Sequence, residues 1–323
     1  MKLIIQIPCL NEETTLPDTI RDLPTKIEGM TEIEYLVIDD GSTDQTAEVA
    51  RSLGVHHVLQ LGSNRGLARA FSRGIEYALA QGADIVVNTD ADNQYRGEDI
   101  ARLVQPILAN QADLVVGCRP IIEHPEFTPA KKLLQRLGSW TLRQVSQTTV
   151  RDAASGFRAF SREACQRLFV YSSFSYCMET LIQAGTTGLR VASVDIRVNA
   201  STRPSRLFKS VPQYLAKSGM TIFTMFMLYR PGRFFAAIGG FLLAIAFALG
   251  FRFIWLVYLS PTPDPGRTYL PSLILTAICG VMGLLVCVLG VLGELVKFQR
   301  RLQEESLYQL RRSRGNRDQE KHT

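Results

Sequence analysis

Two aspartates, one residue apart, are the feature of this chain that most directly suggests chemistry. Asp90 and Asp92 lie in NTDADN (residues 88–93), directly after the apolar run ADIVV (residues 83–87). If the chain stays extended there, both carboxylates point to the same side, because side chains alternate along a strand. They would repel each other unless a divalent cation such as Mg²⁺ or Mn²⁺ held both ionised, and such a cation completes its shell with phosphate oxygens. The pair predicts a metal-diphosphate site; the alternative is two solvated turn residues.

The elements that must position these carboxylates alternate along the chain. Short β-branched runs at residues 2–8, 34–40, 56–61, 83–90 and 112–118 are separated by stretches of helical pattern such as 42–54 and 66–82. This predicts an α/β fold with a mostly parallel sheet and helices on both faces, and Gly54 and Gly82 lie where helices should end. Ligands of such sheets bind at the carboxyl ends of the strands, where Asp39 and Asp40 also fall.

Two apolar blocks in the last third of the chain are each long enough to cross a bilayer. Residues 234–259 and 270–296 exceed the roughly 20 residues that a membrane helix needs, and Arg252 can snorkel from the end of the first block. The turn between them is short and nearly neutral, whereas basic residues flank the outer ends. By the positive-inside rule, both termini face the cytoplasm. We expect an integral protein of the plasma (inner) membrane, with no secretory signal at its start.

We therefore expect four parts. Residues 1–205 form a cytosolic catalytic domain, 206–233 juxtamembrane amphipathic helices, 234–296 two transmembrane helices with a short external turn, and 297–323 a basic cytosolic tail that is disordered after Leu310. Within the first part, residues 119–129 read as a loop, 130–146 as an amphipathic helix and 152–161 as a turn-rich stretch. Small residues at 239–250 could make contacts between chains or pack the two spans of one chain.

Cysteine spacing and charge exclude several classes of function. The six cysteines show no CxxC or Cys/His spacing, so disulfides and structural zinc are not expected. The net charge of +6 could suggest nucleic acid, but much of the excess sits beside the spans and in the tail. Anionic lipid is the simpler partner, and we expect no nucleic acid.

The order of several short motifs resembles a known family. IPCLNEE (7–13), IDDGSTD (38–44), GSNRGLARA (62–70), NTDADNQY (88–95) and DAASGFR (152–158) follow one another as in family 2 (GT-A) glycosyltransferases. The chain is similar to the membrane-anchored branch that includes dolichyl-phosphate mannose synthase and the bacterial polyprenyl-phosphate glucosyltransferases. The resemblance covers residues 3 to about 210 by motif, and two C-terminal spans match the bacterial type in layout.

The resemblance implies a nucleotide-sugar donor, UDP- or GDP-linked, with Mg²⁺ or Mn²⁺ held by Asp90 and Asp92. The donor-binding residues that it implies are Pro8, Asn11, Glu12, Asp39, Asp40, Arg65, Gly66, Asp90, Ala91 and Gln94. A structural alternative is that Asn11 and Glu12 cap the first helix, and Ser42, Thr43 and Asp44 are expected to cap the second.

A second group of residues is expected to bind the phosphate of a polyprenyl phosphate. Planar guanidinium groups near the membrane suit a lipid phosphate, although each arginine could equally be a solvated surface charge. Where the mannose synthases have RxxGxS, this chain has RPSR, which weakens the case for mannose and for a role of Ser205. The expected acceptor residues are Arg119, Arg158, Arg203, Ser205 and Arg206.

Asp152 resembles the acidic residue proposed as catalytic base in the bacterial relatives. A phosphomonoester is mostly a dianion at neutral pH and needs little deprotonation. Asp152 could instead orient Arg158 or the sugar, or simply shape a turn. With Asp92 and Arg158 it completes the expected catalytic set; Glu179 is a weaker candidate for sugar or metal contact, and the histidines 56, 57 and 124 are expected to be structural.

Together these features predict an inverting glycosyltransferase that moves a hexose, with UDP-glucose favoured as donor, to a polyprenyl phosphate at the cytoplasmic membrane face. One alternative is a processive polysaccharide synthase, which needs more spans and a QxxRW signature that the chain lacks. Another is a catalytically silent nucleotide-sugar-binding scaffold, against which the intact pair Asp90 and Asp92 argues. If the small residues at 239–250 make contacts between chains, the protein forms a homo-oligomer.

Overall fold

The computed structural model describes residues 1–120, 148, 150–170, 176–199, 220, 223–224, 227, 229–259 and 270–320, with side chains up to residue 313. Contacts divide the chain into two compact units, Met1–Ile222 with Glu304–Thr323, and Phe223–Gln303. The helix predicted at 130–146 and most of the amphipathic helices predicted at 206–233 lie outside the described residues.

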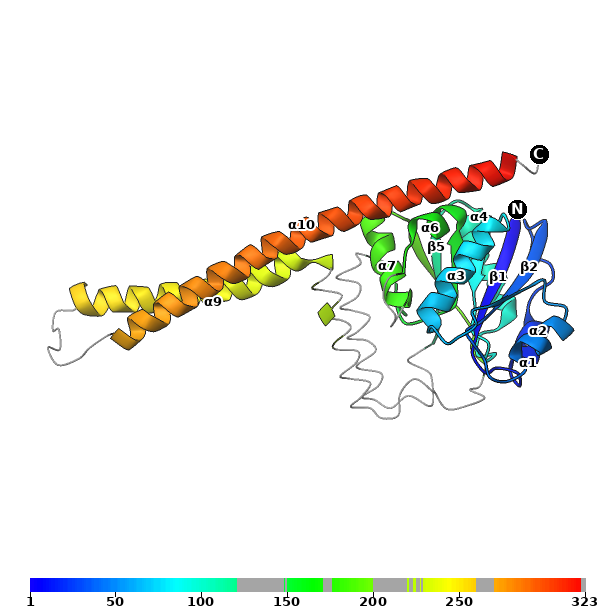
Figure 1. The fold of residues 1–323 in the computed structure, drawn as a ribbon, viewed down its shortest axis with the longest axis horizontal. Helices are drawn as coiled ribbons and strands as arrows, with labels where there is room; N and C mark the ends of the chain where they lie inside the picture. Colours follow the sequence, from blue (N-terminus) through cyan, green and yellow to red (C-terminus); the bar gives the residue numbers. More distant parts are fainter. Residues whose placement is uncertain are drawn as a thin grey trace. The chain divides into compact units, whose positions relative to one another are not determined.

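A seven-stranded sheet forms the centre of the described part of the first unit (Figure 1). Its strand order is β3-β2-β1-β4-β6-β5-β7, and every neighbouring pair is parallel except the two that involve β6. The strands are β1 (Lys2–Cys9), β2 (Glu32–Asp39), β3 (His57–Gln60), β4 (Ile85–Asn88), β5 (Leu114–Cys118), β6 (Arg158–Ser161) and β7 (Val191–Asp195). This is the mostly parallel sheet that the sequence predicts.

Helices cover both faces of this sheet. A Cβ added at Gly74 in α3 would meet Gln6, whereas Leu103 in α4 clusters with Ile5. Neighbouring residues of β1 point to opposite faces, so α3 and α4 lie on opposite faces, and the central strands are buried throughout as continuous apolar runs. The helices of this unit are α1 (Leu16–Asp22), α2 (Thr46–Ser52), α3 (Leu67–Ala80), η1 (Gly97–Asp99, a 3-10 helix), α4 (Ile100–Leu108), α6 (Arg162–Arg167) and α7 (Tyr176–Thr187).

Strand β6 corrects the description of residues 152–161 as turn-rich. Its four residues pair antiparallel with β4, and three of them also pair antiparallel with β5. A strand this short that begins with an arginine shows neither the length nor the alternation by which strands are predicted. Because β6 runs against its neighbours, its first residue, Arg158, lies opposite Asn88 at the end of β4.

The second unit contains two long apolar helices. Helix α9 (Pro231–Ile254) continues as the π-helix η2 (Trp255–Leu259), and α10 covers Leu270–Glu320. Length and composition allow both to cross a membrane, as the sequence predicts. A Cβ on Gly239 would lie 2.5 Å from Cys287 Sγ, and one on Gly283 would lie 2.8 Å from Leu243 Cγ. These glycines therefore pack the two helices of one chain, which is the second alternative that the sequence left open.

The end of α10 corrects the prediction of disorder after Leu310. The helix continues to Glu320, and Tyr308 is buried in the first unit. Its hydroxyl hydrogen-bonds to the carboxylate of Glu163 at 3.0 Å, and the guanidinium of Arg167 lies 4.2 Å from its ring centre. Tyr308 and Arg311 are three residues apart and so share one helical face, whereas the side chains of Arg312 and Ser313 are exposed.

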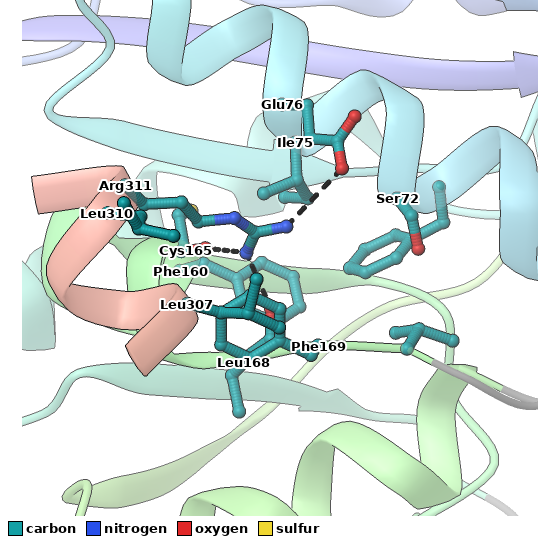
Figure 2. Close-up of a pocket in the computed structure, with 12 residues that line it drawn as sticks. Ser72, Ile75, Glu76, Phe160, Cys165, Leu168, Phe169, Leu307, Leu310 and Arg311 are labelled. Carbon is teal, nitrogen blue, oxygen red and sulfur yellow. Dashed lines mark hydrogen bonds and ion pairs between the residues drawn. The ribbon is translucent and has the colours of Figure 1, made fainter. Parts of the chain in front are cut away.

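A cavity of about 380 Å³ lies beside this end of α10, against α3 and α6 (Figure 2). Arg311 reaches across it and donates to the carbonyl oxygens of Leu168 at 3.0 Å and Cys165 at 3.3 Å, so it satisfies carbonyl groups at the end of α6. Figure 2 also shows its contact with Glu76, at 3.4 Å. Of the predicted site residues that the structure describes, none is among those that line this cavity.

Candidate active site

The predicted site residues of the first unit converge at one edge of the sheet. The strands β1, β2, β4 and β5 point in one direction, so their carboxyl ends share an edge, and antiparallel β6 begins there. Loops that follow these four strands, and the loop before β6, must meet at this edge. They contain the predicted residues Asn11, Glu12, Asp40, Asp90, Asp92, Arg119 and Asp152.

The loops after β1 and β2 are tied to each other. Asn11 has φ of 56°, and its Oδ1 accepts a hydrogen bond from the amide of Thr43 at 2.8 Å. The amide of Glu12 donates to Thr46 Oγ1 at 2.9 Å. At the start of α1, the carbonyl oxygen of Glu12 accepts from the amides of Thr15 and Leu16, and its Oε2 accepts from Thr15 Oγ1 at 2.6 Å. Glu12 therefore stabilises this helix end, whereas the side chain of Asn11 is engaged by the loop after β2. At the second helix, Asp44 accepts from the amide of Thr46, the first residue of α2.

Asp39 and Asp40 are buried at the end of β2 and hold backbone in place. Asp40 accepts from the amides of Arg65 at 2.9 Å and Gly66 at 2.8 Å, and Asp39 accepts from the amide of Ser42 at 2.8 Å. Gly66 has φ of 89°, a backbone conformation that favours glycine. The side chain of Arg65 is exposed at the surface, while Pro8 is buried within β1 beside β2.

Asp90 and Asp92 lie on a turn, which corrects the expectation that extended chain brings them together. Strand β4 ends at Asn88, and Asn93 has φ of 54°. Asp92 Oδ1 accepts from the amide of Gln94 at 3.2 Å, which closes the turn. Ala91 is buried within it, and its carbonyl oxygen accepts from the hydroxyl of a threonine in α1 at 2.9 Å. Local turn chemistry rather than strand alternation sets the position of both carboxylates.

The electrostatics of this turn suit a divalent cation. Burial, together with the negative charges of Asp92 and Glu12, raises the pKa of Asp90 to about 7, although Arg119 opposes the shift. A cation would remove the cost of ionising such a carboxyl. Carboxylate oxygens are ligands that Mg²⁺ and Mn²⁺ prefer. In the described residues no group of three or more acidic, histidine or cysteine side chains could enclose an ion; a cation held by one or two carboxylates completes its shell with water or phosphate oxygens.

Arg119 and Asp152 form a two-point ion pair. Nε and Nη2 of Arg119 donate to the two carboxylate oxygens of Asp152 at 2.7 and 3.1 Å, and Asp152 is fully buried. Both carboxylate oxygens of Asp152 are thus engaged by charge-assisted hydrogen bonds from one guanidinium. The geometry favours a positioning role over a base, and the arginine positioned is Arg119 rather than Arg158.

Arg158 is the main correction to the predicted acceptor site. Its side chain is fully buried, and its guanidinium donates to the carbonyl oxygens of Ala153, Ser155 and Cys177 at 2.7–2.8 Å and to Thr180 Oγ1 at 2.9 Å. Four of the five N–H groups of this side chain are therefore satisfied within the protein. Arg158 braces the loop at residues 152–157 against α7 and is not positioned to bind a phosphate.

The remaining predicted residues lie elsewhere. Arg203, Ser205, Arg206 and His124 fall outside the described residues. His57 Nε2 hydrogen-bonds to Glu34 at 2.9 Å, a structural contact as predicted. Glu179 is buried in α7.

Three residues that the sequence did not single out, Asn88, Gly156 and Tyr176, contact one another next to Asp90. Asn88 Nδ2 donates to Gly156 O and to Tyr176 Oη, each at 3.0 Å. A Cβ on Gly156 would lie 3.2 Å from Asp90 Oδ1. The glycine before the arginine in SGFR was the available signal, because such a glycine often marks close backbone approach; nothing local marks Tyr176.

The converging acidic loops agree with the family expected from the motifs, and a family comparison decides the matter. The sequence model of one protein family, glycosyl transferase family 2, matches residues 4–169. The chain belongs to glycosyl transferase family 2. The turn that carries Asp90 and Asp92 lies inside the matched region, as does the ion pair of Arg119 with Asp152.

Curated relatives of this family 2 protein include lipid-phosphate glycosyltransferases. It is 28% identical over 214 residues to the UDP-N-acetylglucosamine–dolichyl-phosphate N-acetylglucosaminyltransferase of Methanococcus voltae, covering 59% of this chain and 83% of the relative. It is 26% identical over 206 residues to the undecaprenyl-phosphate mannosyltransferase of Micrococcus luteus, covering 61% and 83%.

A solved structure confirms the GT-A fold. Glucosyl-3-phosphoglycerate synthase from Mycobacterium tuberculosis, in complex with Mn²⁺, UDP and glucosyl-3-phosphoglycerate, superimposes with a TM-score of 0.52 at 21% identity, covering 70% of this chain and 78% of that one. At this identity the likeness concerns the fold alone.

Proposed function

We propose that this family 2 protein transfers a hexose from a nucleotide-sugar to a polyprenyl phosphate, with inversion at the anomeric carbon. The observation that carries the proposal is the meeting of two groups of opposite charge at one sheet edge. Arg119 lies close enough to Asp90 for its positive charge to oppose the upward shift of the Asp90 pKa, while Asp152 holds the guanidinium of that arginine. A metal-bound diphosphate and an incoming phosphate need such neighbouring sites.

The acceptor class is supported by the relatives. The names of the two lipid-phosphate enzymes specify dolichyl phosphate and undecaprenyl phosphate. UDP-glucose is the donor we favour, because the motifs resemble those of the polyprenyl-phosphate glucosyltransferases; GDP-mannose and other UDP-sugars are tested beside it. We assign the nucleotide to the cross-tied loops that carry Asn11, Glu12 and Asp40.

Asp90 and Asp92 would hold Mg²⁺ or Mn²⁺ in this proposal. A cation bound there supplies electrostatic stabilisation of the charge that develops on the departing diphosphate. The raised pKa of Asp90 supports this assignment, since burial and neighbouring charge make the isolated carboxylate costly. The solved neighbours hold Mn²⁺ or Mg²⁺ with UDP on the same fold.

The protein's own residues would act mainly by orientation. A phosphate oxygen of the acceptor forms the new bond to the anomeric carbon, while the bond from that carbon to the diphosphate oxygen breaks and its electron pair leaves with the nucleotide. The acceptor has a second pKa near 6, so roughly nine-tenths of it is already a dianion at neutral pH. No base is then required, which agrees with the engagement of Asp152 by Arg119. Arg119 would place the phosphate through its Nη1 group.

The two apolar helices support a site of action at the membrane. Basic residues flank them on the sides of the chain termini. By the positive-inside rule we therefore assign the catalytic domain and both termini to the cytoplasmic side, and we propose the plasma (inner) membrane as the location. Tethering to the bilayer would raise the local concentration of a lipid acceptor.

The test is a donor panel with full-length protein in detergent. Radiolabelled UDP-glucose, UDP-N-acetylhexosamine and GDP-mannose are each supplied with undecaprenyl phosphate and Mn²⁺, and label extracted into organic solvent is counted. We expect transfer from one donor and loss of at least a hundredfold in Asp92→Asn, since that change removes a proposed metal ligand. The absence of organic-soluble label with every donor would refute the proposal; a long water-soluble polymer would instead indicate a processive synthase.

A further inference from the structure

Gly156 is held on both sides by buried side chains. Its amide donates to Tyr95 Oη at 3.4 Å. Its carbonyl oxygen accepts from Asn88 Nδ2 at 3.0 Å and from Tyr176 Oη at 3.4 Å. This glycine belongs to the loop of residues 152–157, which also contains Asp152. The three side chains thus pin the loop to the end of β4, two residues before Asp90.

These three side chains are themselves fixed. Asn88 is fully buried, and its Oδ1 accepts from Gln6 Nε2 at 2.9 Å. The ring of Tyr176 stacks on Phe71 with centres 4.2 Å apart, and the ring of Tyr95 stacks on a phenylalanine of the same loop at 4.8 Å. Stacked, buried rings cannot yield readily to a new atom. The peptide of Gly156 therefore rests on a rigid support.

The space around Gly156 admits no side chain. A Cβ there would lie 2.8 Å from Tyr176 Oη, closer than real Cβ contacts, and 3.2 and 3.4 Å from the two carboxylate oxygens of Asp90. Because the stacked and buried tyrosine resists displacement, an alanine would push the backbone at residue 156 out of place, while its Cβ would crowd the carboxylate of Asp90. The missing side chain lets the loop lie directly against Asp90.

We propose that Gly156 is a positioning residue for Asp90, and this role rests on the proposed function. The loop that carries Asp152, and through it orients Arg119, forms the wall against which the carboxylate of Asp90 lies. The loop of residues 152–157 thus contacts the proposed metal ligand, Asp90, and also holds the proposed acceptor arginine, Arg119. Glycine at this position sets the distance between them.

The test is Mn²⁺ binding, measured by electron paramagnetic resonance on full-length protein in detergent, with Mn²⁺ alone and with UDP or GDP added. Gly156→Ala should weaken Mn²⁺ binding roughly 10- to 100-fold, the range seen when groups behind a metal ligand are changed. Wild-type affinity in Gly156→Ala, with the wild-type protein binding Mn²⁺, would overturn the positioning role and leave the proposed function intact. Failure of the wild-type protein to bind Mn²⁺ under all three conditions would overturn both.

A double variant separates an effect on Asp90 from a general loss of packing. Tyr176→Phe removes the oxygen that a Cβ would meet at 2.8 Å but leaves the contacts with Asp90. We expect Gly156→Ala/Tyr176→Phe to regain most of the thermal stability lost in Gly156→Ala, while Mn²⁺ binding stays weak. Recovery of wild-type Mn²⁺ affinity in the double variant would contradict the proposal.

Gly29 provides a control outside this loop. It has φ of 87°, and a Cβ there would lie 3.0 Å from Leu108 Cδ1, with no carboxylate among its nearest contacts. Gly29→Ala should lower the melting temperature, because alanine is strained at this φ and would crowd Leu108, but Mn²⁺ affinity should remain that of the wild-type protein. An equal loss of Mn²⁺ affinity in both variants would show that lost stability, not contact with Asp90, is responsible.

Discussion

The guanidinium of Arg119 holds both carboxylate oxygens of Asp152, at 2.7 and 3.1 Å, in a position where Asp152 is fully buried. Such a pair is held together by charge-assisted hydrogen bonds on two parallel axes, which fix the plane of the guanidinium. An arginine with a fixed plane suits recognition of a tetrahedral phosphate. In the proposed function Asp152 orients Arg119, and kinetic measurements can distinguish this role from that of a base.

Asp152→Asn should raise the acceptor KM more than it lowers kcat. The amide can accept one hydrogen bond from Arg119 but loses the charge, which corresponds to about 1.5–3 kcal/mol, or roughly 10- to 150-fold. The acid limb of the pH profile should stay near the second pKa of the acceptor phosphate, about 6, in both proteins. Steady-state kinetics over a pH series checks this. A kcat loss with disappearance of the acid limb would identify Asp152 as a base after all.

Arg158→Ala should act on folding. It removes four hydrogen bonds and leaves the buried carbonyl oxygens of Ala153 and Ser155 without the donors that Arg158 supplies. We expect a loss of about 3–5 kcal/mol in the free energy of unfolding, and Arg158→Lys should rescue little because an ammonium cannot span these acceptors. Thermal unfolding measures the change. Arg102→Ala, which removes a half-exposed partner of Asp99, should lower stability far less.

Mn²⁺ binding should depend on pH. In the metal-free protein, the pKa of Asp90 is raised from 3.8 to about 7, so the proton must leave before a cation binds. Apparent affinity should fall roughly tenfold per pH unit below about 7 and level off above it. The free energy of unfolding of the metal-free protein should change with pH in the opposite direction. The folded state binds the proton of Asp90 more tightly than the unfolded state does, so the contribution of Asp90 to stability falls as pH rises from about 4 to 7. Calorimetry at several pH values tests both, and Asp90→Asn should abolish the pH dependence.

The contacts that Tyr308 and Arg311 of α10 make with α6 should slow hydrogen exchange in α6. Tyr308→Phe removes the hydrogen bond to Glu163, worth about 1 kcal/mol for a partly exposed carboxylate. Arg311→Ala removes donors from the carbonyl groups at the end of α6 and the contact with the Phe169 ring. Both should speed hydrogen exchange in α6. Exposed Arg312 is the control, and equal exchange in Arg312→Ala and Arg311→Ala would show that the dock contributes nothing.

Adjacent glycines in α9 should differ sharply in their tolerance of a side chain. A Cβ on Gly239 would lie 2.5 Å from Cys287 Sγ, whereas Gly240 faces open space. Gly239→Leu should separate the two apolar helices and lower the melting temperature in detergent by several degrees, as overpacking commonly costs about 1–3 kcal/mol. Gly240→Leu should leave it unchanged. Equal effects would mean that Gly239 is not at the contact between the helices.

Much of the fold follows from local pattern. The strands at β1, β2, β4 and β5 are runs of apolar, often β-branched residues, and the spans are long enough to need no tertiary information. Strand β6 escaped prediction because a four-residue strand takes its identity from the partners on either side. The docked end of α10 escaped for the same reason, since Tyr308 is buried by residues more than 140 positions away.

By itself the sequence determined the family, the parallel sheet, the two apolar helices and the acidic residues at the sheet edge. The tertiary structure decided what the individual charges do. The sequence assigned Arg119 and Arg158 the same role, that of binding the acceptor phosphate. In the structure, Arg119 pairs with Asp152 beside the turn of Asp90, whereas Arg158 is buried against backbone carbonyl groups. The physical reason is that the energy of a charge depends on its burial and on partners brought together from distant parts of the chain.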